Sequence, residues 1–265
     1  IQERNRDGQP ISLRGIYNVV AHLCSALSYA HEKGPHGTLR PSVVWVTRGG
    51  RVKVHDFGIG TFDGLDGELV LLDGVCYHVG AGGAASVADG GRTVPFAVVT
   101  WFEADTTTPI ADVELLAALE RALDAHRPTQ NVFVGIRIEG VFDMLAMRAA
   151  CPAAPGENLV QATAHQSEFT VDHIDGTLIG FWAPDYARAV NVPGYHFHFL
   201  SSDRSTGGHV LDVRATSLAT SLHVESDIHL ALPRTAEFLD ADLSGDTSDD
   251  LRIAEGSRVE GHDWV

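Results

Sequence analysis

Tyr195-His-Phe-His-Phe-Leu200 is the stretch of this chain that says most about its fold. Its residues alternate strictly, and successive side chains of a β-strand point to opposite faces, so both histidines lie on one face and the aromatic residues on the other. Residues 201–208 then supply turn residues, and His209-Val-Leu-Asp-Val213 resumes a strand. If the two strands form a hairpin, a register with His198 opposite His209 places their Cβ atoms about 5 Å apart.

Three neutral imidazoles on one sheet face, from His196, His198 and His209, suit a catalytic zinc ion, which takes three protein ligands and keeps one position open. The spacing alone does not establish such a site. Because 14 of the 265 residues are histidine, chance yields roughly 0.7 His-x-His pairs in a chain of this length. The alternative is a set of half-buried histidines on an ordinary sheet, each satisfied by hydrogen bonds.

Outward from this hairpin, the pattern predicts an α+β protein that is mainly β-sheet with a few helices. Helical spacing of apolar residues predicts two helices, over 12–33 and 112–126. Period-two alternation and turn residues predict two hairpins, with turns at Gly49-Gly50 and Asp73-Gly74. The expected strands are 42–47, 51–55, 68–72, 75–79, 94–102, 132–138, 177–182, 195–200, 209–214 and 222–224, and the acidic stretch 240–250 is expected to be a surface loop.

Composition limits the classes of partner. The chain carries a net charge of −16 and an isoelectric point near 5.1, which argues against nucleic acid and anionic membranes as partners, since both are polyanions. The same charge repels an anionic substrate, so such a substrate requires a local cationic site. No apolar run approaches the length of a membrane-spanning helix, and three scattered cysteines favour reduced thiols over a disulfide framework.

Charged residues outside the histidine hairpin are ambiguous when each is taken alone. Glu68 begins an expected strand and is compatible with a solvated charge at a strand end. Glu255 lies in a charged C-terminal stretch where a surface position is the ordinary expectation. Arg148 ends the run Phe142-Asp-Met-Leu-Ala-Met-Arg148 and is compatible with an exposed cation.

Several segments, taken together and in order, resemble the bacterial acetolactate decarboxylase family over about residues 56–260. The segments are Asp56-Phe-Gly-Ile-Gly-Thr-Phe-Asp-Gly-Leu-Asp-Gly-Glu-Leu69, Val94-Pro-Phe-Ala97, residues 131–148, Gly176-Thr-Leu-Ile-Gly-Phe-Trp182, Asn191-Val-Pro-Gly-Tyr-His-Phe-His-Phe199 and Gly207-Gly-His-Val-Leu-Asp212.

The resemblance implies two mixed β-sheet lobes around a zinc ion held by His196, His198 and His209. It further implies that Arg148, Glu68 and Glu255 are catalytic and that Arg148 and Thr61 bind substrate. Family members convert (S)-2-acetolactate, a 2-hydroxy-3-oxo acid, to (R)-acetoin and CO₂, and commonly form homodimers. A cytoplasmic location is the accompanying expectation, and export is not excluded by the sequence.

These residue types suit the chemistry that the resemblance implies. Loss of CO₂ from a β-keto acid leaves a carbanion that becomes an enediolate, and a zinc ion stabilises that charge as a Lewis acid. An arginine holds a carboxylate in a bidentate grip. The two glutamates then handle protons, one of them delivering a proton to a single face of the enediolate. The sequence does not say which glutamate does which.

Residues 1–55 resemble a different family. Ala26-Leu-Ser-Tyr-Ala-His-Glu-Lys-Gly34, His36-Gly-Thr-Leu-Arg-Pro41 and Val52-Lys-Val-His-Asp-Phe-Gly58 are similar to the C-lobe of a bacterial serine/threonine protein kinase. Gly37 and Thr38 stand where that family has an arginine and its essential aspartate, so phosphoryl transfer is excluded. We therefore expect a kinase-like segment over 1–55, not an independent domain, followed by a decarboxylase-like domain over 56–265. The alternative is an ordinary N-terminal helix packed on the first sheet.

Two other functions remain open at this point. One is a different three-histidine zinc enzyme, such as a cupin-like oxygenase or a hydrolase, although the glutamate that cupins add shortly after the His-x-His pair is absent from Leu200–Arg204. The other is a non-enzymatic regulatory fusion protein, which the degenerate kinase-like segment suggests. A metal site assembled with Arg148 and both glutamates argues against the second alternative.

Overall fold

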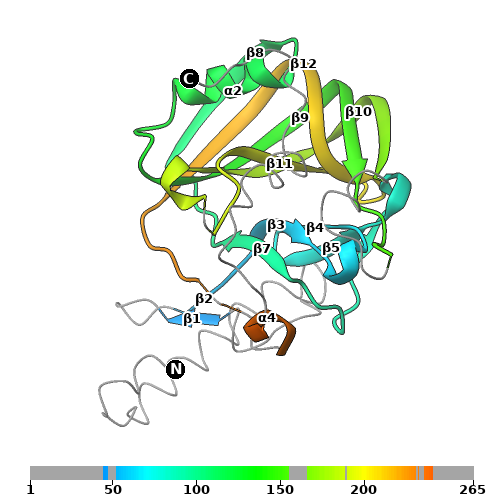
Figure 1. Cartoon of the computed structure of the whole chain (residues 1–265). Helices are drawn as coiled ribbons and strands as arrows, with labels where there is room; N and C mark the ends of the chain where they lie inside the picture. The colour runs from blue at the N-terminus through cyan, green and yellow to red at the C-terminus, as the bar shows by residue number, and fades with distance from the viewer. Residues whose placement is uncertain are drawn as a thin grey trace, which may run out of the picture.

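The computed structural model describes residues 44–46, 52–154, 166–188, 190–230, 232 and 236–240. Within these residues the protein is mainly β, with few helices, which confirms the predicted fold class. Two five-stranded sheets face each other (Figure 1), and a short hairpin of β1 (Val44–Val46) and β2 (Val52–Val54) lies beyond the smaller sheet. The pairings between described strands are all antiparallel, so these sheets are not of the mixed kind that was expected.

The small sheet is a short antiparallel unit with the strand order β6-β5-β4-β3-β7. The turn between β4 and β5 is Asp73-Gly74, as predicted, and both residues have a positive φ, of 52° and 77°, as a two-residue hairpin turn requires. The strands are β3 (Phe57–Thr61), β4 (Glu68–Leu72), β5 (Val75–Val79), β6 (Ala85–Val87) and β7 (Phe96–Thr100).

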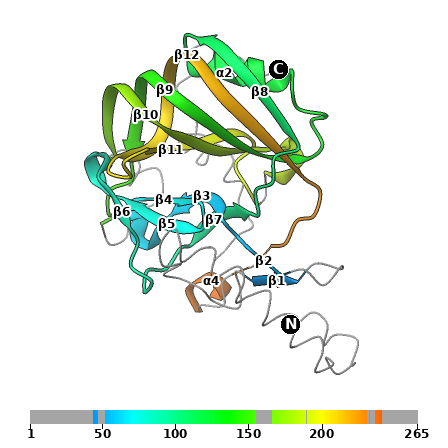
Figure 2. The same ribbon diagram turned by 180° about the vertical axis from the view of Figure 1, so that it is seen from behind.

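The large sheet contains long, bent strands in the order β11-β10-β9-β12-β8. Its first strand also pairs with β12, so part of the sheet curls back on itself (Figure 2). The strands are β8 (Thr106–Val113), β9 (Phe133–Ala149), β10 (Ser167–Ala183), β11 (Gly194–Ser201) and β12 (Gly207–Glu225). Two α-helices, α2 (Leu116–Asp124) and α4 (Ala236–Asp240), and three single-turn 3-10 helices (Asp63–Leu65, Ala81–Gly83 and Asp185–Ala187) complete the described elements.

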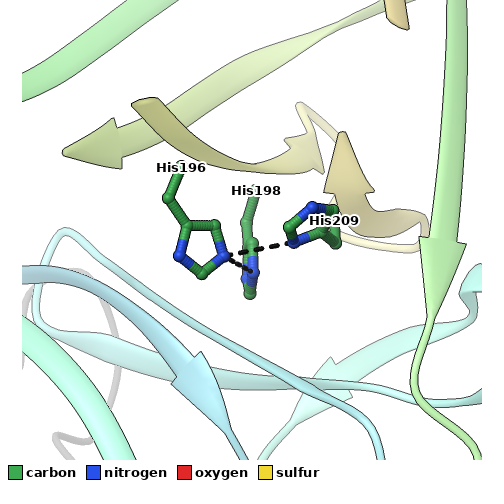
Figure 3. Close-up of side chains that lie close together, drawn as sticks. All are labelled: His196, His198 and His209. Carbon is green, nitrogen blue, oxygen red and sulfur yellow. Dashed lines mark hydrogen bonds between the residues drawn. The ribbon is translucent and has the colours of Figure 1, made fainter. Parts of the chain in front are cut away.

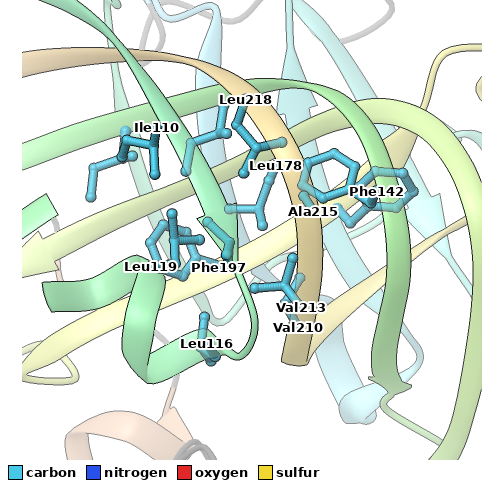
Figure 4. Close-up of a cluster of buried hydrophobic side chains, with 14 of the residues drawn as sticks. Ile110, Leu116, Leu119, Phe142, Leu178, Phe197, Val210, Val213, Ala215 and Leu218 are labelled. Carbon is cyan, nitrogen blue, oxygen red and sulfur yellow. The ribbon is translucent and has the colours of Figure 1, made fainter. Parts of the chain in front are cut away.

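Two apolar layers hold these elements together. The first fills the space between α2 and the large sheet and includes Leu119, Phe197 and Phe199 (Figure 4). The second lies between the two sheets and includes Ile59, Val70 and Leu200. β11 therefore buries both of its faces, its aromatic residues in the first layer and its histidines and Leu200 beside the second, as the alternation predicts.

Several boundaries differ from the predicted ones. The helix predicted over 112–126 begins only at Leu116, because Val113 still belongs to β8 and the first helical N–H, that of Leu116, donates to Asp212 Oδ1 at 2.7 Å. This cap comes from a distant strand and has no local signal. The predicted strands 209–214 and 222–224 are two parts of one strand, β12. The predicted helix 12–33, the turn Gly49-Gly50 and most of the loop 240–250 lie outside the described residues.

Candidate metal centre

The three predicted metal ligands meet in one place. His196 and His198 project from the same face of β11, and His198 lies directly opposite His209 of β12, which is the predicted register. His196 Nε2 lies 3.2 Å from His198 Nε2 and 3.1 Å from His209 Nδ1 (Figure 3). The three candidate ligand atoms all lie within 4.8 Å of one another, so this cluster could hold a metal ion.

The small sheet orients one of these rings. His198 Nδ1 lies 3.1 Å from the carbonyl oxygen of Leu69 on β4. A carbonyl accepts a hydrogen bond, so the proton of the neutral ring is on Nδ1 and the lone pair is on Nε2, which faces the other two histidines. A backbone group of the small sheet thus fixes the tautomer of one candidate metal ligand on the large sheet.

Burial keeps the three imidazoles neutral. It is the largest cause that lowers the pKa of each ring below the ordinary 6.5, and the nearby Arg148 guanidinium lowers all three pKa values further. The pKa of His198 falls to about 3. Three neutral rings whose nitrogen atoms converge form a donor set that suits a divalent cation and does not lose its ligands to protons near neutral pH. The residues present therefore fit a metal ion.

A guanidinium and a carboxylate flank the cluster, both from predicted positions. Arg148 lies on β9 directly opposite His209, and its side chain is buried. Glu68 begins β4 and is also buried, with Oε2 3.7 Å from His198 Nε2 and with Oε1 accepting a hydrogen bond of 3.0 Å from the Ala150 N–H. Arg148 and Glu68 reach the histidines from different sheets, so the site spans the interface between the two sheets.

Thr61 lies beside Glu68. It is directly opposite Glu68 in the β3–β4 ladder, so the two side chains share the face that looks toward the histidines. The turn before Glu68 is held by Asp66, whose carbonyl oxygen lies 2.7 Å from His78 Nε2 and accepts a hydrogen bond of 3.2 Å from Arg92 Nη1. The structure thus brings together six of the seven predicted site residues.

The seventh predicted residue, Glu255, lies outside the described residues. Sequence reasoning missed the two backbone groups that position the site, the Leu69 carbonyl and the Ala150 N–H. Neither group could have been found from residue type, because every residue other than proline carries the same two groups.

Two facing β-sheets bury three neutral histidines beside an arginine and a glutamate, and this is a cluster that could hold a metal ion. Comparison with known proteins identifies the family. A sequence model described as alpha-acetolactate decarboxylase matches residues 48–245, and the chain belongs to this family.

Individual members of the family are similar in sequence to most of this chain. The alpha-acetolactate decarboxylase of Methanosarcina mazei is 40% identical over 206 residues, which are 77% of this chain and 72% of that protein. The enzyme of Bacillus subtilis is 36% identical over 207 residues, 77% of this chain and 81% of its own. The crystal structure of the Bacillus subtilis enzyme superposes with a TM-score of 0.73 at 35% identity, covering 76% of this chain and 87% of that one.

The kinase-like resemblance of residues 1–55 receives no such support. The family match begins at residue 48, within the segment that the sequence assigned to the kinase-like part. Most of that segment lies outside the described residues, and its short described strands, β1 and β2, pair only with each other.

Proposed function

We propose that this chain is a carboxy-lyase that converts 2-acetolactate to acetoin and CO₂. The observation that carries the proposal is the convergence of three neutral histidines, Arg148 and Glu68 on one buried site in a member of the alpha-acetolactate decarboxylase family. The (S) configuration of the substrate and the (R) configuration of the product belong to the same proposal.

Zinc is the metal that we propose for His196, His198 and His209. Three imidazoles leave a tetrahedral ion one open position, which is the arrangement of catalytic zinc sites. When bound, the ion supplies a Lewis acid that stabilises negative charge developing on substrate oxygens. The Leu69 carbonyl supports this assignment because it leaves His198 Nε2 as the ligand atom.

Arg148 is the proposed binding group for the substrate carboxylate. A chain with a net charge of −16 repels an anion at long range, and a buried guanidinium supplies the local positive charge that binding requires. A bidentate pair between the two planar groups would also fix the orientation of the carboxylate. Its position opposite His209 supports this role.

The reaction breaks the bond between the carboxylate carbon and the carbinol carbon. The electron pair stays with the organic fragment as an enediolate, CO₂ leaves, and one proton is added to carbon, so that acetolactate anion and a proton give acetoin and CO₂. We propose that Glu68 handles a proton in this sequence, since its carboxylate lies 3.7 Å from His198 Nε2. Thr61, beside it, is the proposed hydrogen-bond partner of the substrate, and Glu255 stays the proposed second proton-handling residue.

The test uses the full chain as purified. It is incubated with racemic acetolactate while acetoin and CO₂ are followed, before and after removal of metal by a chelator and after addition of zinc. We expect acetoin and CO₂ to form, activity to vanish with the metal and activity to return with zinc. His198→Ala should lose both bound zinc and activity, whereas the exposed His126→Ala should keep both.

Other results would redirect the assignment. Restored activity with iron or manganese but not zinc would change the metal, and absence of acetoin from metal-replete protein would overturn the proposed reaction and favour another three-histidine enzyme. The homodimer is part of the proposal too, and sedimentation of the purified chain tests it. A cytoplasmic location stays a prediction, and no described helix is long and apolar enough to span a membrane.

A further inference from the structure

Two arginines of the large sheet converge on one carboxylate of the small sheet. Arg137 of β9 donates from Nη1 to Asp73 Oδ1 at 2.8 Å, and Arg204, in the turn between β11 and β12, places Nη2 3.5 Å from Asp73 Oδ2. Arg204 reaches this position across the ring of Tyr77, whose centroid lies 5.9 Å from the guanidinium carbon. Asp73 therefore bridges two separate parts of the large sheet.

Arg204 is an unfavourable residue for stability at this position. Its φ is 64°, in the left-handed region where a side chain with Cβ is strained. Within the described part of the chain, Arg204 Nη1 is also buried without a hydrogen-bond partner, which opposes folding. An ion pair whose two side chains are each 33% exposed returns little stability. These facts indicate that the Asp73–Arg204 contact serves something other than stability.

The Asp73–Arg204 contact joins the end of β4 to the turn between β11 and β12, and these three strands carry the histidines and Glu68 of the candidate site. The turn that carries Arg204 directly connects β11, which holds two of the histidines, to β12, which holds the third. Asp73 directly follows β4, which carries Glu68 and the Leu69 carbonyl. The same turn is tied to the small sheet a second time, since Ala85 N–H donates to the Ser205 carbonyl at 2.9 Å.

We propose that Asp73 and Arg204, assisted by Arg137, are positioning residues that set the spacing between the two sheets at the site. Short antiparallel strands transmit a displacement along their length, so the spacing at Asp73 governs how Glu68 and Leu69 meet the histidines. Arg204 touches no reacting group and acts only through β4 and the β11–β12 hairpin. The activity readout of this proposal rests on the proposed function, and its metal readout does not.

The decisive variant is Arg204→Gly in the full chain, because it removes the guanidinium and relieves the left-handed backbone at once. We expect the urea midpoint of unfolding to stay the same or rise, while kcat for acetoin formation falls about tenfold or more with little change in KM. Arg204→Lys should recover part of kcat. An ordinary structural role predicts the opposite pattern, a lower midpoint with kcat per folded molecule unchanged.

Two matched controls separate the effect of relieving a left-handed backbone from the effect of removing an arginine ion pair. His173→Gly relieves a similar left-handed residue, with φ of 50°, at an exposed position of β10. Arg188→Ala removes an exposed ion pair with Asp185 that does not join the sheets. Both control variants should keep wild-type kcat, and a loss of kcat in either that equals the loss in Arg204→Gly would overturn the proposal.

The second readout is the visible spectrum of cobalt(II) bound at the histidine cluster, which reports ligand geometry whether or not the protein decarboxylates acetolactate. A shifted spectrum or a faster loss of cobalt to chelator in Arg204→Gly supports the proposal, and a wild-type spectrum and loss rate overturn it. If the wild-type protein makes no acetoin, the proposed function fails, while the cobalt comparison still decides the positioning role.

Discussion

Gly180→Ala should disturb the candidate metal centre by displacing β11, the strand that carries His196 and His198. Gly180 lies on β10 directly opposite Phe197 of β11. A Cβ built at this position would lie closer than 3.0 Å to the Phe197 ring and to the His196 carbonyl oxygen. Ordinary carbon contacts are about 3.5–4.0 Å, so the strands must separate by about 1 Å, and His196 moves with its own carbonyl.

The expected losses of stability and of reaction rate follow from that displacement. Forcing one methyl group into a closely packed site typically lowers the free energy of unfolding by about 1–3 kcal/mol. A shift of about 1 Å in a group that positions the reaction reduces the rate by about 10²-fold. We therefore expect Gly180→Ala to stay folded, to bind zinc more weakly and to form acetoin about 10²-fold more slowly.

The measurements are the urea midpoint, the zinc content after dialysis against a weak chelator, and kcat. Gly91→Ala is the matched control, because its Cβ would meet only the side chain of Asp89, at 3.4 Å. If Gly180→Ala retained wild-type zinc affinity and kcat, β11 would not be held in place by its contact with β10, and the account of how the hairpin is positioned would be refuted.

Three further changes test other parts of the molecule. Arg148→Ala should lower kcat/KM by at least about 10²-fold, and an unchanged value would remove Arg148 from substrate binding. Thr220→Val should raise the free energy of unfolding by about 1 kcal/mol, measured with urea, because the Thr220 hydroxyl is buried without a hydrogen-bond partner in the described part of the chain. Burial, and after it the charge of Asp124, raises the pKa of Glu120 from 4.5 to about 7. The folded state thus holds this proton more tightly than the unfolded chain, and stability is lost as the pH rises from 4.5 to 7. Glu120→Gln should therefore raise the free energy of unfolding by about 1–2 kcal/mol at pH 8 and by little at pH 4. The value at pH 8 is smaller than the full pKa shift would give, because the side chain is only partly buried. The exposed Glu114→Gln is the matched control for the loss of one carboxylate from the surface.

The local part of this fold could be predicted from the sequence. β4 and β5 have the predicted bounds, and the Asp73-Gly74 turn lies between them. The register of His198 against His209 is also confirmed. These features depend on alternation and turn chemistry within a few residues, which a sequence displays directly.

The long strands could not be delimited in the same way. β9 and β12 extend well beyond the predicted strands. The prediction stopped short because the middle sections of these strands lack a continuous alternation of apolar and polar residues. Gly140, with φ of 159°, lies within β9, and the β9–β12 register shifts between Val210 and Asp212. Such bends are set by the curl of the whole sheet, to which no single segment is a guide.

The residues of the candidate site also differ in how far the sequence alone could predict them. Strand geometry places the three histidines on one face, and the resemblance makes them candidate ligands, whereas Arg148 and Glu68 have no local signal and were assigned by resemblance alone. What brings them together is the pairing of β9 with β12 and the packing of β4 against β11. The Asp73–Arg204 contact was not predicted either, because it joins residues of different sheets.

The double pairing of β11, with β10 on one edge and β12 on the other, constrains how this protein can change over evolution. A one-residue slip of β11 against both neighbours would turn both histidines toward the aromatic layer and the aromatic residues toward the site, so the candidate metal cluster and the packing of the strand would be lost together. Selection for a new substrate therefore has little freedom on the large sheet. The small sheet is constrained at Glu68 and Leu69 as well, because the Glu68 carboxylate and the Leu69 carbonyl both contact His198.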